Sequence, residues 1–224
     1  MKRFFNVVSF DIGKKNFAFC IDKVYSSRLN KLNVIPKKDR YNKDGTAKPV
    51  FETELNKLYK CSSVVLMRNL DLTEGCDNSK YLDDKVYVNL LHTLDEYKKE
   101  WDKCDHILIE KQMAFRGKHN VMAVKLAQFV LSYFVIRYDG KKKIVDYPAY
   151  HKTQILGAKK VDVKLKPKRK KWAIVKSQEI LEYKKDKVGL EEISKFKKKD
   201  DVSDCMLMNL TYLHLHFKDG MYDD

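Results

Sequence analysis

Short apolar runs bounded by turn residues recur along the chain and predict the strands of a sheet. Residues 4–10 and 16–25 are rich in Val, Ile and Phe and flank a tight turn, so we expect them to form a hairpin. Similar runs at 63–67, 106–110 and 143–147 predict three further strands. The run 106–110 ends in an acid, which suits a central strand that carries a carboxylate at its carboxyl end.

Apolar residues that repeat every three or four positions predict helices between and after these strands. Such stripes cover residues 80–101, 122–136 and 201–217, and another helical segment lies near 171–187. Residues 28–60 are polar and basic without sustained periodicity, so we expect a long connection or an insertion there, with room for one extra strand.

The alternation of predicted strands and helices favours an α/β fold. We expect a mixed five-stranded sheet with helices on both faces. A chain of 224 residues with 44% hydrophobic content can bury a full core, and this length suits one domain spanning 1–224 better than two. Several superfolds would satisfy this layout.

The charge of the chain changes the picture because it is large and uneven. Lys and Arg total 46 against 31 Asp and Glu, a net charge of +15. Residues 141–199 hold 20 of the basic and 7 of the acidic residues, so this quarter of the chain carries +13. Such clustering favours a polyanionic partner, nucleic acid or an anionic membrane, over a merely solvated surface.

The cysteines and the first residues bear on the compartment. The five cysteines form an odd set without a C-x-x-C pair, which fits neither a disulfide framework nor a zinc finger and predicts a reducing, intracellular setting. The apolar run after Met1 is cut short by Asp11, so we expect neither a signal peptide nor a membrane span there.

Four acids stand where this layout could bring them together. Asp11 closes the first strand, Glu110 closes the strand at 106–110, and Asp201 and Asp204 open the last helix. Each has a plain structural explanation: Asp11 as a turn residue before a glycine, Glu110 as a strand end, and Asp201 as an acid favoured by the helix dipole. Those explanations stay open for each acid alone.

The spacing of the last two acids makes a metal site the better account. Residues i and i+3 share one helical face, so Asp201 and Asp204 point the same way. Carboxylates held that close repel unless a cation lies between them, which suggests Mg²⁺ or Mn²⁺ rather than zinc. Four carboxylates can hold two such ions about 3.5–4 Å apart for phosphodiester hydrolysis.

Three short motifs carry a resemblance to a known family. The stretches FDIGKKN at 10–16, LIEKQ at 108–112 and KKDDVSD at 198–204 resemble those of the poxvirus-type Holliday junction resolvases, which are relatives of bacterial RuvC. The resemblance implies an RNase H-like fold of the RuvC type and a homodimer. It also implies paired, Mg²⁺-dependent nicks across four-way DNA junctions, inside the host cell or the virion of a virus.

The resemblance assigns roles residue by residue. Asp11, Glu110, Asp201 and Asp204 match the four catalytic acids that ligate two Mg²⁺ ions, with Mn²⁺ as a substitute, whereas Asp200 is an extra acid outside this set. No small-molecule cofactor and no membrane partner are expected.

The family also has a catalytic lysine shortly before a helix, and we match it to Lys171, with Lys170 as the next choice. A plain phosphate-binding role for this basic cluster stays equally open. Other cations beside the motifs could contact backbone phosphates, and nearby aromatic residues could stack on bases. The candidates for phosphate contact are Lys14, Lys15, Arg116, Lys118, Lys168, Arg169 and Lys170, and those for stacking are Phe115, Tyr150 and Trp172.

Three other functions compete with a junction resolvase. The acids alone would serve another RNase H-like nuclease, such as RNase H or an integrase-like enzyme. The pattern D-I-G-x-x-N at 11–16 also resembles the first phosphate loop of actin-like and sugar-kinase ATPases, but no second glycine-rich phosphate motif follows. Finally, the charge alone would suit a nucleic-acid-binding protein without catalytic activity.

Overall fold

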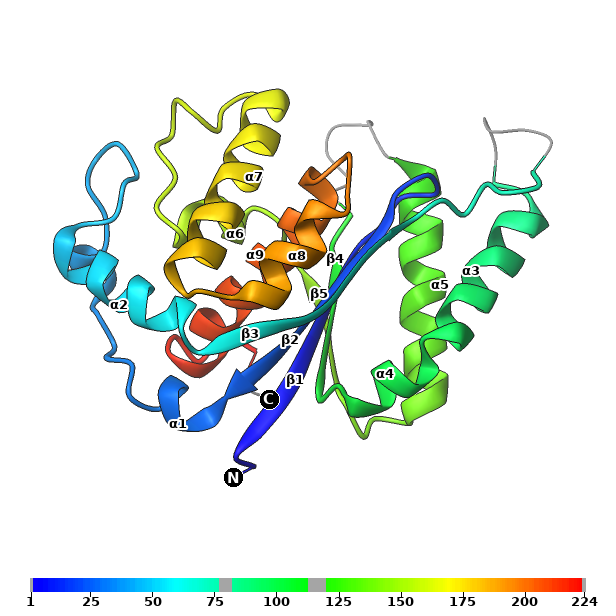
Figure 1. Cartoon of the computed structure of the whole chain (residues 1–224), viewed down its shortest axis with the longest axis horizontal. Coiled ribbons are helices and arrows are strands. Elements are labelled where there is room, and N and C mark those ends of the chain that lie inside the picture. The colour runs from blue at the N-terminus through cyan, green and yellow to red at the C-terminus, as the bar shows by residue number, and fades with distance from the viewer. Residues whose placement is uncertain (1, 77–81, 113–119, 223–224) are drawn as a thin grey trace.

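A mixed five-stranded sheet forms the centre of the molecule in the computed structural model, which describes residues 2–76, 82–112 and 120–222 (Figure 1). The strand order is β3-β2-β1-β4-β5. Strands β1, β2 and β3 are antiparallel neighbours, while β4 and β5 run parallel to β1. The strands are β1 (Phe4–Asp11), β2 (Phe17–Tyr25), β3 (Ser62–Leu70), β4 (His106–Glu110) and β5 (Lys143–Tyr147), so the predicted sheet is confirmed.

Helices cover both faces of this sheet, as predicted. One face carries α3 (Asp84–Glu96), α4 (Lys98–Lys103) and α5 (Val121–Tyr138) over a core rich in aromatic rings (Figure 1). The other face carries α9 (Asp200–Phe217). Outside α9 lie α2 (Pro49–Tyr59), α6 (His151–Ile155) and α7 (Lys166–Tyr183). Helix α8 (Lys187–Ser194) packs directly on the edge strand β3, and α1 (Ser26–Leu29) follows β2 directly.

Alternation along β1 assigns its side chains to the two faces. Val8 and Phe10 belong to the core under α3, α4 and α5, whereas Val7 belongs to the core under α9. Ser9 shares the second face, where its Oγ donates a hydrogen bond to the carbonyl oxygen of Cys205 on α9 at 2.7 Å. Side chains two residues apart point to the same face of a strand, so Asp11 must also point towards α9.

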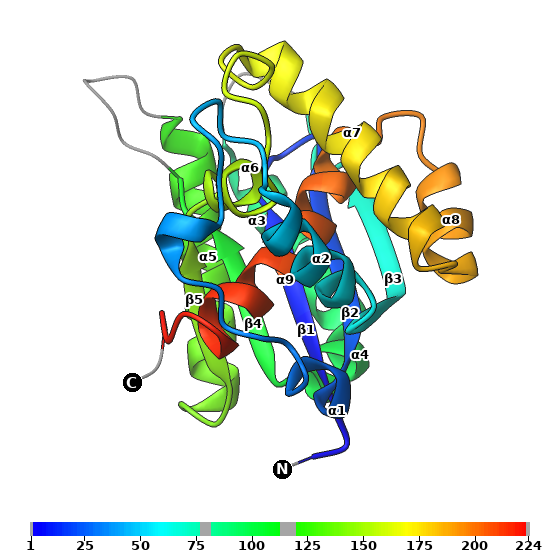
Figure 2. The same ribbon diagram turned by 90° about the vertical axis from the view of Figure 1, so that its left-hand side faces the viewer.

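Helix α9 is buried along nearly its whole length between the sheet and the outer helices (Figure 2). Its buried polar residues bind the sheet backbone, since Asn209 Nδ2 donates to the carbonyl oxygen of Cys20 at 3.1 Å. Buried polar groups are tolerated where they are hydrogen-bonded in this way. These bonds fix the position of α9 along β1 and β2.

Three local predictions differ from the structure. The segment 28–60 holds α2 and a 3₁₀ turn, η1 (Lys37–Asp39), so the extra strand expected there is wrong. The stripe at 80–101 divides near Tyr97 into α3 and α4. The segment near 171–187 is two helices, because α7 begins at Lys166 with Pro167 in its first turn, where proline is favoured, and α8 follows.

Candidate active site

Parallel pairing of β1 with β4 brings two of the predicted acids together. Phe10 lies opposite Ile109 in this pairing, so Asp11 and Glu110 form the next pair along the two strands. Leu108, two residues before Glu110, faces the core under α9, and Glu110 therefore faces the same side as Asp11. Both carboxylates stand at the carboxyl ends of their strands.

The first two turns of α9 supply the other two acids. Asp201 and Asp204 line the same cavity as Asp11 and Glu110, a cleft of about 600 Å³. We call it the acidic cleft and define it by these four side chains. The structure therefore places the four acids around one space, although they come from three separate segments of the chain.

A buried lysine that the sequence prediction missed also belongs to the acidic cleft. Lys152 comes from α6, and its Nζ lies 3.0 Å from Oδ1 of Asp204 and 3.9 Å from Oε1 of Glu110. Its side chain is only 7% exposed, so the ammonium group is held between two carboxylates out of water. The available signal was its position shortly after β5, at the edge of the sheet where β1 and β4 also end.

The electrostatics of the acidic cleft follow from burial and close charges. Burial raises the pKa of Asp11 well above its usual value, and the neighbouring Glu110 raises it further through its charge and a hydrogen bond. Burial also raises the pKa of Asp204, although Lys152 opposes this effect. Burial alone would lower the pKa of Lys152, but Asp204, Glu110 and Asp11 raise it above the ordinary value. Lys152 therefore stays charged beside Asp204 and Glu110.

Two further lysines bind the acids at the start of α9. Lys170 forms an ion pair with Asp200, and its Nζ lies 3.8 Å from Oδ1 of Asp201. Lys198 pairs with Asp201 and lies 3.7 Å from Asp200. Asp200, which we left outside the catalytic set, thus serves as the partner of a lysine at the edge of the cleft.

The other predicted residues are distributed as follows. Arg169, Lys170, Tyr150 and Trp172 line the acidic cleft. Lys171 and Lys168 are exposed on α7 and do not line it, and Lys14 and Lys15 lie in the turn after Asp11. Arg116, Lys118 and Phe115 fall outside the described residues.

The donors of the acidic cleft fit a hard divalent cation by their chemistry. All four acids offer carboxylate oxygens, the ligands that Mg²⁺ and Mn²⁺ prefer. Within 2–76, 82–112 and 120–222, no group of three or more His, Cys, Asp or Glu side chains has the arrangement of a formed metal site. Burial and the neighbouring acids raise the pKa values of Asp11 and Asp204, and a divalent cation among the carboxylates would offset both causes.

Solved structures that superpose on this chain define the class of fold. The fowlpox virus resolvase in complex with substrate Holliday junction DNA superposes with a TM-score of 0.51 at 18% identity, over 93% of this chain and 97% of that one. Thermus thermophilus RuvC superposes with a TM-score of 0.52 at 13% identity, over 95% and 97%. The chain therefore has the RuvC-like resolvase fold, as its motifs predicted.

Comparison of sequences then gives the family. The chain is 30% identical to uncharacterized protein 97L of Invertebrate iridescent virus 3, over 92% of this chain and 98% of that protein. It is also 30% identical to uncharacterized protein 170L of Invertebrate iridescent virus 6, over 95% and 91%. The protein belongs to the family of these iridescent virus proteins. No protein-family model matches the chain.

Proposed function

We propose that this protein is a metal-dependent endonuclease that resolves four-way DNA junctions. The observation that carries the proposal is the acidic cleft, in which four carboxylates and a buried lysine converge on the RuvC-like fold. The relatives are viral proteins, so the proposed setting is recombination and concatemer resolution of viral DNA in the host cell. The same observation makes an ATPase less suitable, because a phosphate-binding loop needs backbone donors rather than converging acids.

In this proposal Asp11, Glu110, Asp201 and Asp204 hold two Mg²⁺ ions. These ions would supply a water of lowered pKa and neutralise charge on the scissile phosphate. Burial and Glu110 raise the pKa of Asp11, and a cation bound beside it would favour the ionised carboxylate instead. The carboxylates are held in register by the β1–β4 pairing and by the bonds that fix α9 to the sheet.

Lys152 is the lysine that the geometry favours for a catalytic role. Its ammonium group orients Asp204 and Glu110 and presents a fixed positive charge inside the cleft, where it can stabilise charge that develops on a phosphate. Lys171, our choice from the sequence, lies outside the cleft on the exposed side of α7. Its role in catalysis stays a prediction, and contact with backbone phosphates suits its position better.

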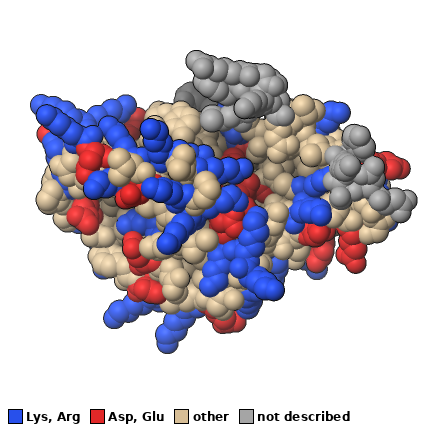
Figure 3. All heavy atoms as spheres, turned by 90° about the horizontal axis from the view of Figure 1, so that it is seen from above, with Lys and Arg blue, Asp and Glu red and all other residues tan. Residues whose placement is uncertain are grey.

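A basic rim around the acidic cleft would hold the DNA. Lys111, Lys166, Arg169 and Lys170 line the cleft above the acids. Figure 3 shows acidic groups in a hollow of this face, surrounded by Lys and Arg. Cations placed there contact phosphates and position a strand without reading its sequence. Lys14, Lys15 and Lys168 would extend this path.

Paired nicks require two active sites, and α5 offers a surface for a homodimer. Leu126, Val130 and Phe134 bury one face of α5 against the sheet. The opposite face exposes Val124, Val135 and Ile136, the last of which is 81% exposed. Exposed apolar side chains on the outer face of a helix suit contact with a second copy of the chain. By length and composition alone α5 could span a membrane, but a sheet-packed helix passes that test too.

The test is cleavage of a labelled four-way junction, a matched duplex and an RNA–DNA hybrid, each with Mg²⁺ and with EDTA. We expect symmetric nicks in the junction that require Mg²⁺ or Mn²⁺, and little cutting of the duplex. Equal cutting of duplex and junction would refute junction resolution. Preferential cutting of the hybrid would favour an RNase H, and EDTA-resistant binding without cleavage would favour a non-catalytic binding protein.

A further inference from the structure

A second cavity lies away from the acidic cleft, and seven of the fourteen residues that line it are Lys or Arg. It has a volume of about 1020 Å³ and lies between the start of β3, the segment after β2 and the turn joining α7 to α8. Arg28 and Lys31 come from the segment after β2, and Lys57 and Lys60 from the end of α2. We call it the β3 groove and define it by these four residues together with Lys184, Lys185 and Lys187.

Asp186, the one acid among the described residues that line the β3 groove, does not compensate the charge of the groove. Asp186 is buried, and its carboxylate accepts hydrogen bonds from the backbone N–H groups of Val64 at 2.8 Å and Gly189 at 3.0 Å. It also pairs with Lys184 at 3.0 Å, so its negative charge is already balanced inside the fold. Asp186 thus acts as the cap of α8 and as a partner for Lys184.

The remaining cations have no carboxylate partner in the described part of the chain, apart from Lys57, which pairs with Glu54. Arg28 donates to the carbonyl oxygen of Lys60 at 2.8 Å and lies over the ring of Tyr25, and Lys60 lies over the ring of Tyr183. These contacts hold the cations in place without neutralising them. Like charges gathered in a concave surface focus a positive potential that a polyanion relieves.

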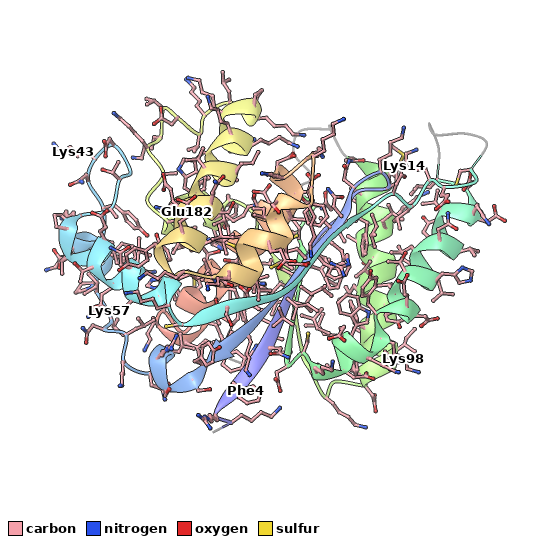
Figure 4. The ribbon with its side chains drawn as sticks, viewed as in Figure 1. Phe4, Lys14, Lys43, Lys57, Lys98 and Glu182 are labelled. Carbon is pink, nitrogen blue, oxygen red and sulfur yellow. The ribbon has the colours of Figure 1, made fainter. Side chains whose placement is uncertain are left out.

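The β3 groove is separate from the acidic cleft. Among the residues that the structure describes, none lines both cavities. Tyr25, in the groove, pairs with Phe4 at the opposite end of β1 from Asp11, and the length of β1 makes this separation about 23 Å at roughly 3.3 Å per residue. Figure 4 shows Lys57 at the end of α2, far from Lys14 in the turn after Asp11.

We propose that the β3 groove is a second DNA-binding site, which holds the phosphate backbone of a junction arm beyond the cleavage site. Cations without a carboxylate partner suit this role, because they bind phosphates by charge and tolerate any sequence. At about 3.4 Å per base pair, an arm must extend roughly 7 base pairs from the acidic cleft to reach the groove. The choice of a junction arm as the ligand rests on the proposed function. The presence of a cationic groove does not depend on it.

The test compares how tightly the wild type and two variants bind junctions with short and with long arms. EDTA is present throughout, so that the DNA is bound but not cut. The groove variant is Lys31→Gln/Lys60→Gln/Lys187→Gln, which removes one exposed lysine from each of three segments. The matched control is Lys85→Gln/Lys98→Gln/Lys99→Gln, which removes three exposed lysines from α3 and α4 on the other side of the sheet. Thermal unfolding confirms that both variants fold.

Fluorescence anisotropy then measures binding to loop-closed junctions with arms of about 6 and about 20 base pairs, on either side of the required reach. With long arms, the groove variant should bind about tenfold more weakly at 0.15 M salt. The slope of log affinity against log salt should also fall by about 2 to 3 units, close to 0.9 per lost phosphate contact. With short arms, the groove variant should match the wild type.

Three results would overturn the proposal. These are equal losses with short and long arms, no loss with either, or a loss as large in the control variant. Loss of polyglutamate binding with unchanged DNA binding would assign the groove to an acidic protein instead. Plain duplexes of the two lengths, measured alongside, keep the result interpretable if the wild type neither prefers nor cuts junctions, an outcome that would refute only the proposed function.

Discussion

Lys152 places a positive charge where the two strand acids meet the first turns of α9. Its partners are Asp204 and Glu110, and its burial makes the electrostatic interaction stronger than at the surface. Removal of one partner from such a buried set leaves the other charges uncompensated, which costs more than the loss of one surface ion pair. Substitution of Lys152 should therefore affect the protein far more than substitution of an exposed lysine of α7.

We expect Lys152→Gln to lower the rate of junction cleavage by about 10²- to 10³-fold, the range for loss of a preorganised group that stabilises transition-state charge. Lys171→Gln, which removes a charge from the exposed face of α7, should keep cleavage within a fewfold of wild type. Single-turnover cleavage with saturating enzyme measures the rate of the cleavage step of each variant, so weaker DNA binding does not affect the comparison. A large loss at Lys171 with none at Lys152 would reverse the assignment.

Asp204→Asn should abolish measurable cleavage while junction binding in EDTA persists. Loss of residues that merely orient a metal ligand costs about 10- to 100-fold, so loss of a proposed ligand should cost at least about 100-fold. Asp204 also binds Lys152 through Oδ1, and the amide keeps that oxygen. Full activity of this variant would remove Asp204 from the metal site. The control is Asp146→Asn, which alters an exposed acid on β5.

His214 should make the stability of the fold, rather than its activity, depend on pH. Burial lowers the pKa of His214 to about 4, although Asp219 opposes the shift. Between pH 6.5 and 4 the unfolded chain binds more protons than the folded protein, so stability falls as the pH drops through this window. At about 1.36 kcal/mol per pKa unit, the full loss from this group is about 3 kcal/mol.

His214→Phe should therefore make unfolding less sensitive to acid between pH 6.5 and 4. Its ring already packs edge-on against Phe51, so phenylalanine suits the site. Urea unfolding at several pH values measures the effect, and the same substitution at exposed His92 provides the control. An unchanged pH profile in His214→Phe would show that His214 does not contribute to acid sensitivity.

At the scale of elements, the segment 28–60 is tied into the fold rather than appended to it. Arg40 donates to both carboxylate oxygens of Asp219, at 2.7 and 2.6 Å, and both side chains are only 4% exposed. Arg40 also donates to the carbonyl oxygen of Ile35 at 2.7 Å. This buried pair joins the segment before α2 to the residues that follow α9.

Arg40→Met should destabilise the protein by about 3–5 kcal/mol, because it leaves Asp219 buried without its partner. The double variant Arg40→Met/Asp219→Leu should regain much of this loss, since no lone charge remains. Lys43→Met, on an exposed residue of the same segment, should change stability by less than about 0.5 kcal/mol. Urea unfolding measures all three, and a single variant as stable as wild type would contradict the prediction.

The elements that the sequence predicted well are those specified by local pattern. Strands β1, β2, β4 and β5 are short apolar runs with clear turn signals, and the stripe of α9 is continuous. Helix α2 was missed because its apolar residues, Phe51, Leu55 and Leu58, lie in a polar and basic stretch without caps. Its packing against α9 stabilises it, and that contact is not visible in a local pattern.

The residues of the candidate site also divide into those that a local pattern predicts and those that it does not. The four acids were predictable because each ends a strand or begins a helix, places where the fold class brings residues together. Lys152 was not, because its contact with Asp204 depends on the path of the 51 intervening residues and on the docking of the short helix α6. The cations of the β3 groove come from three distant segments and carry no motif.

At the scale of the whole molecule, the exposed face of α5 should decide the oligomeric state. We expect wild type to sediment at twice the mass of one chain. The variant Val135→Glu/Ile136→Glu should sediment as a monomer, because charges at these exposed apolar positions cannot be buried in an interface without partners. Analytical ultracentrifugation measures this, with Lys98→Glu on α4 as the control. Because each subunit keeps its own acidic cleft, the monomer should nick junctions singly instead of in symmetric pairs. A variant that stays dimeric would place the interface elsewhere, and a monomeric wild type would refute the homodimer itself.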